Sequence, residues 1–502
     1  MRSDLALLSI AALAVTTAVA AGCSTSDDAP AAPEPTPDTR PPTPPEWDRT
    51  VSRPDEAAAS TDRAACKFTR GALPDETLGN GIPVGKEMPI ETIVVLMQEN
   101  RSFDHYYGHF GKYAGRTDVA SAPEDATNPD RTGPVSSGSH PWHRAPHYCI
   151  LDTTHGWSGS HTQVNDGKMD GFYETNHGLK GETMPDPEMA LRDGERAMTW
   201  YDEREIPYYY ALAKTFGIGD HYFASLQGPT WPNRMYLWAG TSFGYAENRA
   251  FPDVGAYPFP QNDMVILDEL EKRHVDWRLY SSGGPSGVTV VLGPSLVVRY
   301  ARDEILSTMA DFFRDAAEGK LPPVVFLDPD FTKTGAPDGN DEHPPSNLQV
   351  GQHFTSTIID ALMKSPQWRK LALFLTYDEH GGLYDHMPPP KACAPDTKTP
   401  VDRNGAPVEF AFDRYGVRVP FLVVSPYAKR GYVGHGVYDH SSILRFIQAK
   451  HRLPALTARD ANALVPTEFF DFSKPPDLSL PALPQAVIEP GEMQYCDQTF
   501  RQ

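Results

Sequence analysis

The chain has 502 residues, of which 40% are apolar and 22% are charged, so it is long enough to bury a sizeable core without a disulfide framework. Its formal net charge of −21 repels phosphate backbones and anionic membranes over a Debye length of roughly 10 Å. This charge argues against a protein that binds nucleic acid or anionic lipid, although a bound cation can still reverse the sign of the field near a site.

Residues 1–23 have the pattern of an export signal. Arg2 precedes a run from Leu5 to Ala21 that is apolar apart from one serine and two threonines, and small residues then lead to Cys23. This ending resembles a bacterial lipoprotein box, in which Cys23 is lipidated after cleavage and brings the protein into contact with a membrane; plain secretion is the alternative. Both interpretations predict an exported protein, either a cell-envelope lipoprotein or a secreted one.

Residues 24–85 are expected to form a linker and an N-terminal extension. Nine prolines lie between residues 24 and 60. This composition is typical of an extended spacer, because it offers too little apolar surface to form a core of its own. We expect residues 86–502 to form a single domain that ends in a proline-rich tail packed against it. No stretch after the signal reaches the roughly 18 apolar residues that a membrane-spanning helix needs.

Four cysteines remain after Cys23, and an even number in an exported chain predicts two disulfides with three possible connectivities. None of them has CxxC spacing, which disfavours a redox or zinc-knuckle role. We expect Cys66 to pair with Cys149, because that bond would tie down the start of the domain, and this leaves Cys393 to pair with Cys496.

Four short apolar runs are typical of strands buried on both faces: 92–97, 324–327, 371–377 and 420–425. Helical patterns lie between them. Apolar side chains recur every fourth residue from Asn347 to Lys364, and Asp439 is a plausible N-cap for a helix that follows it. This alternation predicts an α/β fold whose central, mostly parallel sheet has helices on both faces.

Polar clusters follow three of these strands, at 98–101, 328–330 and 378–382. Because the carboxyl ends of parallel strands meet at one edge of a sheet, clusters that are distant in sequence can converge there. Glu99, Asn100, Asp378 and Glu379 offer hard oxygen ligands for a divalent cation, and the neighbouring Gly381 and Gly382 permit a close backbone approach. The competing interpretation is a set of ordinary turns and solvated loops.

Thr230 lies beside Gly228 and Pro229, and a hydroxyl held in this way is a usable phosphoryl nucleophile when a metal or base activates it. The sequence also contains three histidines near these segments, His155, His161 and His343, as candidate site residues. A turn around Thr230 and histidines that are merely hydrogen-bonded within the core are the structural alternatives.

Seven segments, taken in order, resemble the bacterial phosphoesterase family that includes phospholipases C and acid phosphatases: 99–105, 155–172, 228–234, 342–345, 378–390, 416–426 and 438–446. The resemblance implies an alkaline-phosphatase-like sandwich and a phosphoesterase catalytic domain. It implies hydrolysis of phosphate esters through a phospho-threonine intermediate on Thr230, with His161 and His343 as catalytic residues. It implies metal ligation by Glu99, Asn100, Asp378 and Glu379, and substrate contacts from His155, Asn233, His380 and His386.

One or more divalent ions are expected, with Ca²⁺, Mg²⁺, Mn²⁺ and Zn²⁺ all compatible with these ligands. We expect a phospholipase C, and the main alternative is an acid phosphatase that acts on small monoesters through the same site. Four aromatic residues near the proposed site could bind a choline headgroup: Trp157, Trp231, Tyr236 and Trp238. Two remoter alternatives are a surface binding protein that has lost turnover, and a sulfatase, since Thr230 opens a T-x-P-x-R box.

Overall fold

Eight strands form the central sheet of this computed structural model, which describes residues 38, 40–131, 138–177, 193–248, 265–284, 286, 300 and 306–500. In spatial order they are β12 (Tyr432–Gly434), β6 (Gly217–Gly219), β11 (Phe421–Val424), β10 (Leu371–Tyr377), β1 (Thr92–Gln98), β9 (Val324–Asp328), β7 (Trp277–Ser281) and β8 (Leu306–Thr308). Strand β11 is antiparallel to both of its neighbours, and the others share one direction. The predicted α/β fold with a mostly parallel sheet is therefore confirmed.

The pairing of the two central strands, β1 and β10, determines where the polar residues that follow them lie. All seven residues of β1 and all seven of β10 are buried, as expected for apolar runs covered on both faces. They pair in parallel from Thr92 opposite Leu371 to Gln98 opposite Tyr377. The residues that follow Gln98 and Tyr377 consequently leave the sheet side by side, at the same edge.

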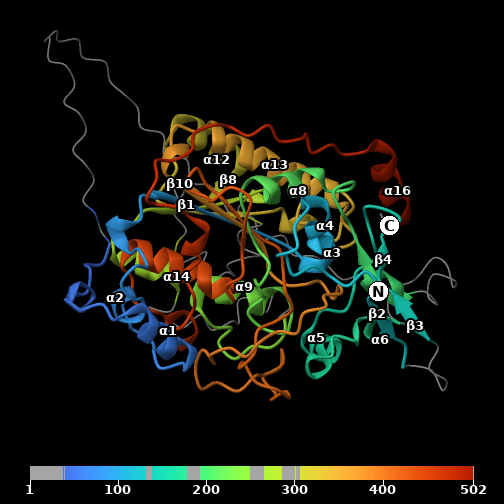
Figure 1. Ribbon diagram of the computed structural model, residues 1–502, viewed down its shortest axis with the longest axis horizontal. Helices are drawn as coiled ribbons and strands as arrows, with labels where there is room; N and C mark the ends of the chain where they lie inside the picture. Colours follow the sequence, from blue (N-terminus) through green and yellow to red (C-terminus); the bar gives the residue numbers. More distant parts are fainter. Residues whose placement is uncertain are drawn as a thin grey trace, which may run out of the picture. The chain divides into compact units, whose positions relative to one another are not determined.

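Helices cover both faces of the sheet (Figure 1). One side carries α8 (Pro207–Thr215), α12 (Met309–Glu318) and α13 (Leu348–Lys364), and the other carries α9 (Thr230–Ala239) and α14 (His440–His451). The predicted helix 347–364 is α13, whose N-cap Asn347 accepts a hydrogen bond from the backbone N–H of Gln349. Helix α14 begins directly after its N-cap Asp439, also as predicted.

Shorter elements complete the described part of the chain. The helices are α1 (Glu56–Ala64), α2 (Pro74–Thr77), α3 (Phe103–Tyr107), α4 (Phe110–Ala114), α5 (Trp157–Val164), α6 (Phe172–Asn176), α10 (Ile266–Lys272), α15 (Ala458–Ala461) and α16 (Pro490–Phe500). Two small strand pairs lie outside the main sheet: β2 (Thr127–Pro129) with β3 (Ser139–Pro141), and β4 (His143–Arg144) with β5 (Thr199–Trp200). No helix in the described ranges is both long enough and apolar enough to cross a bilayer.

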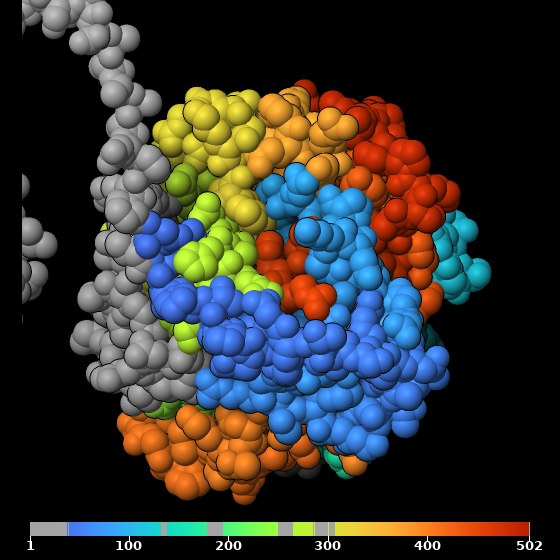
Figure 2. Space-filling model, turned by 90° about the vertical axis from the view of Figure 1, so that its left-hand side faces the viewer, coloured from blue at the N-terminus to red at the C-terminus, as the bar shows by residue number. Residues whose placement is uncertain are grey.

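One compact unit runs from Arg40 to Gln502, so much of the segment expected as linker and extension packs with the main domain. Leu78 and Val84 belong to the main hydrophobic core, and Arg445 of α14 donates a hydrogen bond to the hydroxyl of Thr77. Figure 2 shows this N-terminal segment, in blue, spread over one face beside red segments from near the C-terminus. The signal pattern and Cys23 lie outside the described residues.

Two disulfides form, as the cysteine count predicted, but the expected pairing of Cys66 with Cys149 is wrong. Cys66 pairs with Cys393, and Cys149 pairs with Cys496, across separations of 327 and 347 residues. Partners this distant in sequence become neighbours only through the tertiary fold. One bond joins the N-terminal extension to the loop after β10, and the other joins the C-terminal helix α16 to the domain.

Candidate active site

The polar residues that follow β1 and β10 meet at the carboxyl edge of the sheet. The backbone N–H of Asn100 donates to Oδ1 of Asp378 at 3.1 Å, and the backbone N–H of Arg101 donates to the carbonyl of Glu379 at 3.1 Å. Asn100 has a left-handed backbone, with φ of 59°, which asparagine tolerates better than most residues. The four predicted metal ligands Glu99, Asn100, Asp378 and Glu379 are all fully buried around this contact.

The paired glycines permit this approach. A Cβ atom on Gly381 would lie 2.4 Å from the carbonyl oxygen of Asn100, and one on Gly382 would lie 2.3 Å from that of Thr154. Both glycines also have positive φ, at 63° and 71°. Any side chain at either position would push the loop after β10 away from the residues it faces.

Helix α9 presents Thr230 and Arg234 to the same carboxylates. The hydroxyl of Thr230, the first residue of the helix, donates to Oε2 of Glu99 at 3.3 Å. One turn later, Nε of Arg234 donates to Oε1 of Glu99 at 2.9 Å, and its Nη1 donates to Oδ1 of Asp328 at 3.2 Å. The guanidinium also lies 3.7 Å from Oδ2 of Asp378. The i, i+4 spacing places both side chains on one face of the helix.

Negative charge exceeds positive charge among the buried groups of this site. The carboxyls of Glu99, Asp328, Asp378 and Glu379 are all buried, and among the described residues the guanidinium of Arg234 is the one that contacts three of them. Burial and the neighbouring Asp378 raise the pKa of Glu99 well above its usual range. Burial raises the pKa of Glu379 to about 8 and that of Asp328 to about 6. An added cation would relieve this repulsion.

Several buried oxygen atoms of the site have no hydrogen-bond partner in the described part of the chain: Oδ1 of Asn100, Oδ2 of Asp328, Oδ2 of Asp378 and Oε1 of Glu379. Buried acceptors that are left without a partner are costly, and most such groups in proteins find a donor or a metal ion. Carboxylate and amide oxygens are hard ligands. This donor set therefore fits a divalent cation, and it does not distinguish among Ca²⁺, Mg²⁺, Mn²⁺ and Zn²⁺.

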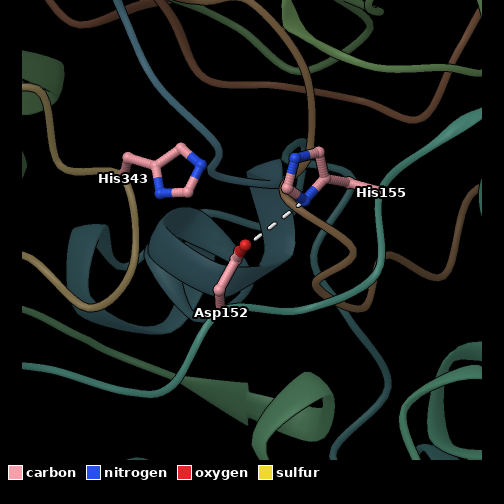
Figure 3. Close-up of side chains that lie close together, drawn as sticks. All are labelled: Asp152, His155 and His343. Carbon is pink, nitrogen blue, oxygen red and sulfur yellow. Dashed lines mark ion pairs between the residues drawn. The ribbon is translucent and has the colours of Figure 1, made fainter. Parts of the chain in front are cut away.

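A second group of potential ligands adjoins the first. One ligand atom each from Asp152, His155 and His343 lie within 4.8 Å of one another, and Figure 3 shows the three side chains converging, with Asp152 ion-paired to His155. Nε2 of His155 accepts a hydrogen bond from the amide of Asn100 at 3.5 Å and lies 4.0 Å from Oε1 of Glu379. These three residues are only partly buried, so they lie on the side of the site that solvent reaches.

Backbone carbonyls orient the two imidazoles. Nδ1 of His155 donates to the carbonyl of Thr153 at 2.6 Å, and Nδ1 of His343 donates to that of Pro344 at 2.6 Å. None of the described hydrogen bonds uses Nε2 of His343, whereas Nε2 of His155 is shared with the amide of Asn100. Although burial opposes it, the carboxylates of Glu379 and Asp152 raise the pKa of His155.

His161, which the sequence suggested as a catalytic residue, lies in different surroundings. Its Nδ1 donates to the carbonyl of Trp157 at 2.7 Å, and its ring stacks on Phe410 with 3.9 Å between the centroids. The ring lines a surface pocket of about 860 Å³, and burial lowers its pKa to about 4. None of the described hydrogen bonds joins it to Thr230 or to the four predicted metal ligands.

Two residues expected to contact substrate, Asn233 and His380, have their polar atoms engaged by the protein. The amide of Asn233, in α9, accepts from the N–H of Leu226 and donates to the carbonyls of Gly228 and Pro229 just before the helix. His380 donates from Nε2 to Gln163 at 2.8 Å, and its Nδ1 lies 3.3 Å from Glu379. Both residues therefore hold the loops that carry Thr230 and Glu379.

His386 belongs to a separate cluster. Its Nδ1 donates to Oδ2 of Asp104 at 2.7 Å, and the buried guanidinium of Arg418 bridges Asp104 and Asp385. All of these groups are satisfied by one another, which is typical of a structural network.

The aromatic residues considered for a choline pocket are mostly part of the core. Trp157 and Tyr236 belong to one buried hydrophobic cluster, and Trp238 packs on Phe326 in the main core. Trp231 is the one of the four that is partly exposed. These positions therefore pack the domain and do not form an aromatic cage.

Arg234, Asp328 and Asp152 were not among the predicted site residues. Asp328 opens the polar cluster 328–330 that the rule on strand ends singled out, although no role at the site was assigned to it. Arg234 lies four residues after Thr230, and helical periodicity could have placed the two side chains on the same face of a helix. No sequence pattern identifies Asp152 as a site residue, because only the path of the loop before α5 brings it beside His343.

Comparison with known proteins shows the family to which the chain belongs. The model of the Phosphoesterase family matches residues 90–454. Non-specific phospholipase C3 of Arabidopsis thaliana is 31% identical over 422 residues, covering 79% of this chain and 77% of the relative. Phospholipase C B of Mycobacterium tuberculosis is 31% identical over 480 residues, covering 85% and 86%.

Among solved structures, a protein of the alkaline phosphatase superfamily from Vibrio parahaemolyticus matches with a TM-score of 0.39 and 9% identity, covering 83% of this chain and 80% of the other. The family predicted from the sequence motifs is confirmed by the match over residues 90–454. The chain therefore belongs to the Phosphoesterase family and is a phosphoric ester hydrolase.

Proposed function

We propose that the protein is a phospholipase C that uses Thr230 as its nucleophile. The observation that carries this proposal is the hydrogen bond from the Thr230 hydroxyl to Glu99, at the edge of the sheet where four buried oxygens have no hydrogen-bond partner among the described residues. Glu99, Asn100, Asp378 and Glu379 would hold a divalent cation. When bound, the cation supplies Lewis-acid stabilisation of the nucleophile and of the phosphoryl oxygens.

The protein itself orients the nucleophile. The contact with Glu99 fixes the hydroxyl of Thr230, and the N-terminus of α9 contributes partial positive charge where negative charge develops. Attack by Oγ1 forms a bond from threonine to phosphorus and breaks the bond from phosphorus to the diacylglycerol oxygen, while the hydroxyl proton passes to Oε2 of Glu99, which returns it when the phospho-threonine is cleaved. Water then cleaves the phospho-threonine, which releases the phosphorylated headgroup and restores the hydroxyl.

His155 and His343 are the proposed proton-transfer groups. Their rings lie 5.7 Å apart, and each has Nδ1 tied to a backbone carbonyl. One of the two protonates the leaving alcohol and later takes a proton from the attacking water. His161, whose described contacts lie with Trp157 and Phe410, is instead proposed to line the neighbouring surface pocket.

The names of the relatives favour a phospholipid as substrate. Non-specific phospholipase C3 and phospholipase C B each match more than three quarters of this chain. A hydrolysis panel of phosphatidylcholine, phosphatidylethanolamine, sphingomyelin and p-nitrophenyl phosphate, with and without chelator, tests the assignment. We expect release of phosphorylated headgroups that the chelator abolishes. Turnover of p-nitrophenyl phosphate alone would make the protein a phosphomonoesterase and overturn the phospholipase proposal.

We also propose that the protein is exported and anchored through a lipidated Cys23. The lipoprotein-like pattern of residues 1–23 supports the anchor, and two disulfides are typical of proteins that fold in an oxidising compartment. Metabolic labelling with a fatty-acid analogue, compared between the full chain and Cys23→Ala, tests the anchor. Equal labelling of both proteins would refute it.

A further inference from the structure

We propose a second divalent-cation site, apart from the active site, formed by Asp220, His221 and His435. Its ligands are two imidazoles and one carboxylate, the donors that Zn²⁺ uses in sites with an open position for water. The site goes beyond the proposed hydrolysis and does not depend on it.

The sheet brings these residues together. Strands β6 and β12 are adjacent and parallel, and they pair up to Gly219 opposite Gly434. The next residues along the two strands are Asp220 and His435, and the backbone N–H of Asp220 donates to the carbonyl of Gly434 at 3.1 Å. His221 follows Asp220 directly. The three side chains therefore leave the sheet at its carboxyl edge from neighbouring positions.

Their donor atoms are already close to the separations that a metal needs. Oδ1 of Asp220 lies 2.6 Å from Nδ1 of His221 and 2.9 Å from Nδ1 of His435. One ligand atom from each of the three residues lies within 4.8 Å of the other two. Tetrahedral zinc with bonds of about 2.0–2.1 Å separates its ligand atoms by roughly 3.3 Å, so small side-chain rotations suffice.

The surroundings hold the carboxylate and leave the site open. Asp220 is buried, and its Oδ2 accepts from the backbone N–H of Ala120 at 2.8 Å, which fixes its orientation. The side chain of His435 is 51% exposed and that of His221 is 28% exposed, so an ion and its water can enter from solvent. Arg418 donates from Nη1 to the backbone carbonyl of Asp220 at 2.8 Å and pairs with Asp104 and Asp385, and Arg116 is ion-paired with Asp118.

This cluster is separate from the catalytic centre. The antiparallel strand β11 lies between β6 and β10, so the two sites sit at different positions along the same sheet edge. A metal here would cross-link the edge strand β12 to β6 and to the loop that carries Ala120. The alternative role is a hydrogen-bonded His–Asp–His network that forms without metal.

Titration of the mature full-length protein with Zn²⁺, after removal of endogenous metal, distinguishes the two roles. Calorimetry would measure the zinc stoichiometry of the parent, of His221→Ala, of His435→Ala and of the control His143→Ala, which alters an imidazole in β4, outside the main sheet. We expect each site variant to bind one equivalent less than the parent and the control, and to show a smaller zinc-dependent rise in melting temperature.

The same variants are then compared in a protein that also carries Asp378→Asn. This substitution removes a proposed ligand of the active site, so that any remaining zinc binding reports on the second site. There we expect zinc binding to survive in the Asp378→Asn protein and to disappear when His435→Ala is added. Zinc stoichiometries that are identical in the parent, His221→Ala and His435→Ala would overturn the proposal and leave the hydrogen-bonded network. Phospholipid hydrolysis by His435→Ala should equal that of the parent, so failure of this proposal is distinct from failure of the catalytic one.

Discussion

The hydroxyl of Thr230 lies 3.3 Å from Oε2 of Glu99, although 131 residues separate them in the sequence. Glu99 follows the central strand β1, whereas Thr230 begins helix α9 on one face of the sheet. Their contact joins the proposed nucleophile to the proposed metal-binding carboxylates, and the catalytic predictions depend on it.

Replacing Thr230 tests the nucleophile. Thr230→Ala removes the attacking oxygen, so we expect phospholipid hydrolysis to fall by roughly 10³-fold or more while metal content stays at the parent level. Thr230→Ser keeps a hydroxyl and should retain measurable turnover. Steady-state hydrolysis and elemental analysis of the same preparations check both statements. Parental activity in Thr230→Ala would show that another group attacks phosphorus.

Asp378→Asn tests metal ligation. The change removes the charge of a carboxylate whose Oδ2 has no hydrogen-bond partner among the described residues, while its size is kept. We expect loss of bound metal at the catalytic site together with loss of turnover. Elemental analysis measures the first and the hydrolysis assay the second. A variant that keeps full activity in the presence of chelator would contradict metal-dependent catalysis.

Arg234→Ala should destabilise the metal-free protein more than the metal-loaded protein. The guanidinium compensates Glu99, Asp328 and Asp378, and removing one partner of a buried ion pair typically costs about 3–5 kcal/mol. Because a bound cation also compensates these carboxylates, metal should recover part of the loss. Thermal unfolding with and without added divalent cation measures the difference. An equal loss in both states would mean that Arg234 and the metal do not share these carboxylates.

Gly381→Ala should impair both metal binding and turnover. The added Cβ would meet the carbonyl oxygen of Asn100 at 2.4 Å and force two of the proposed ligand loops apart. Gly405→Ala is a matched control, because Gly405 also has positive φ, at 84°, but nothing lies within 4 Å of an added Cβ. Equal loss of metal affinity in the two variants would attribute the effect to backbone strain alone.

The pH dependence of stability should reflect His451, the last residue of α14. Burial, with help from Lys450 and Arg273, lowers the pKa of His451 to about 3, so the folded protein holds the imidazole neutral. The unfolded chain takes up a proton near pH 6.5, so the stabilisation is complete above that pH and is lost as pH falls towards 3. We expect His451→Gln to remove roughly 1–2 kcal/mol of the stability difference between pH 7 and pH 5.

Urea unfolding of the parent and His451→Gln across this pH range provides the measurement. His143→Gln serves as the control, because it alters a histidine at the surface strand β4. Parallel pH profiles for the parent and His451→Gln would show that another group causes the loss of stability at low pH.

The sequence identified the parts of this protein that depend on local patterns. Continuous apolar runs predicted strands at β1, β9, β10 and β11, and spacing every fourth residue predicted α13. Because parallel strands end at one edge, the polar residues after β1 and β10 could be placed together before their contacts were known. The even number of cysteines likewise predicted two disulfides.

The tertiary structure decided what no local pattern specifies. Strands β6 and β12 are three residues long and contain glycines, so they carry no apolar run, and pairing with neighbouring strands defines them. Which cysteines bond, and which of the predicted histidines adjoin the carboxylates, depends on contacts between segments hundreds of residues apart. Residue type determines what a side chain can do, whereas long-range packing determines which side chains are close enough to do it together.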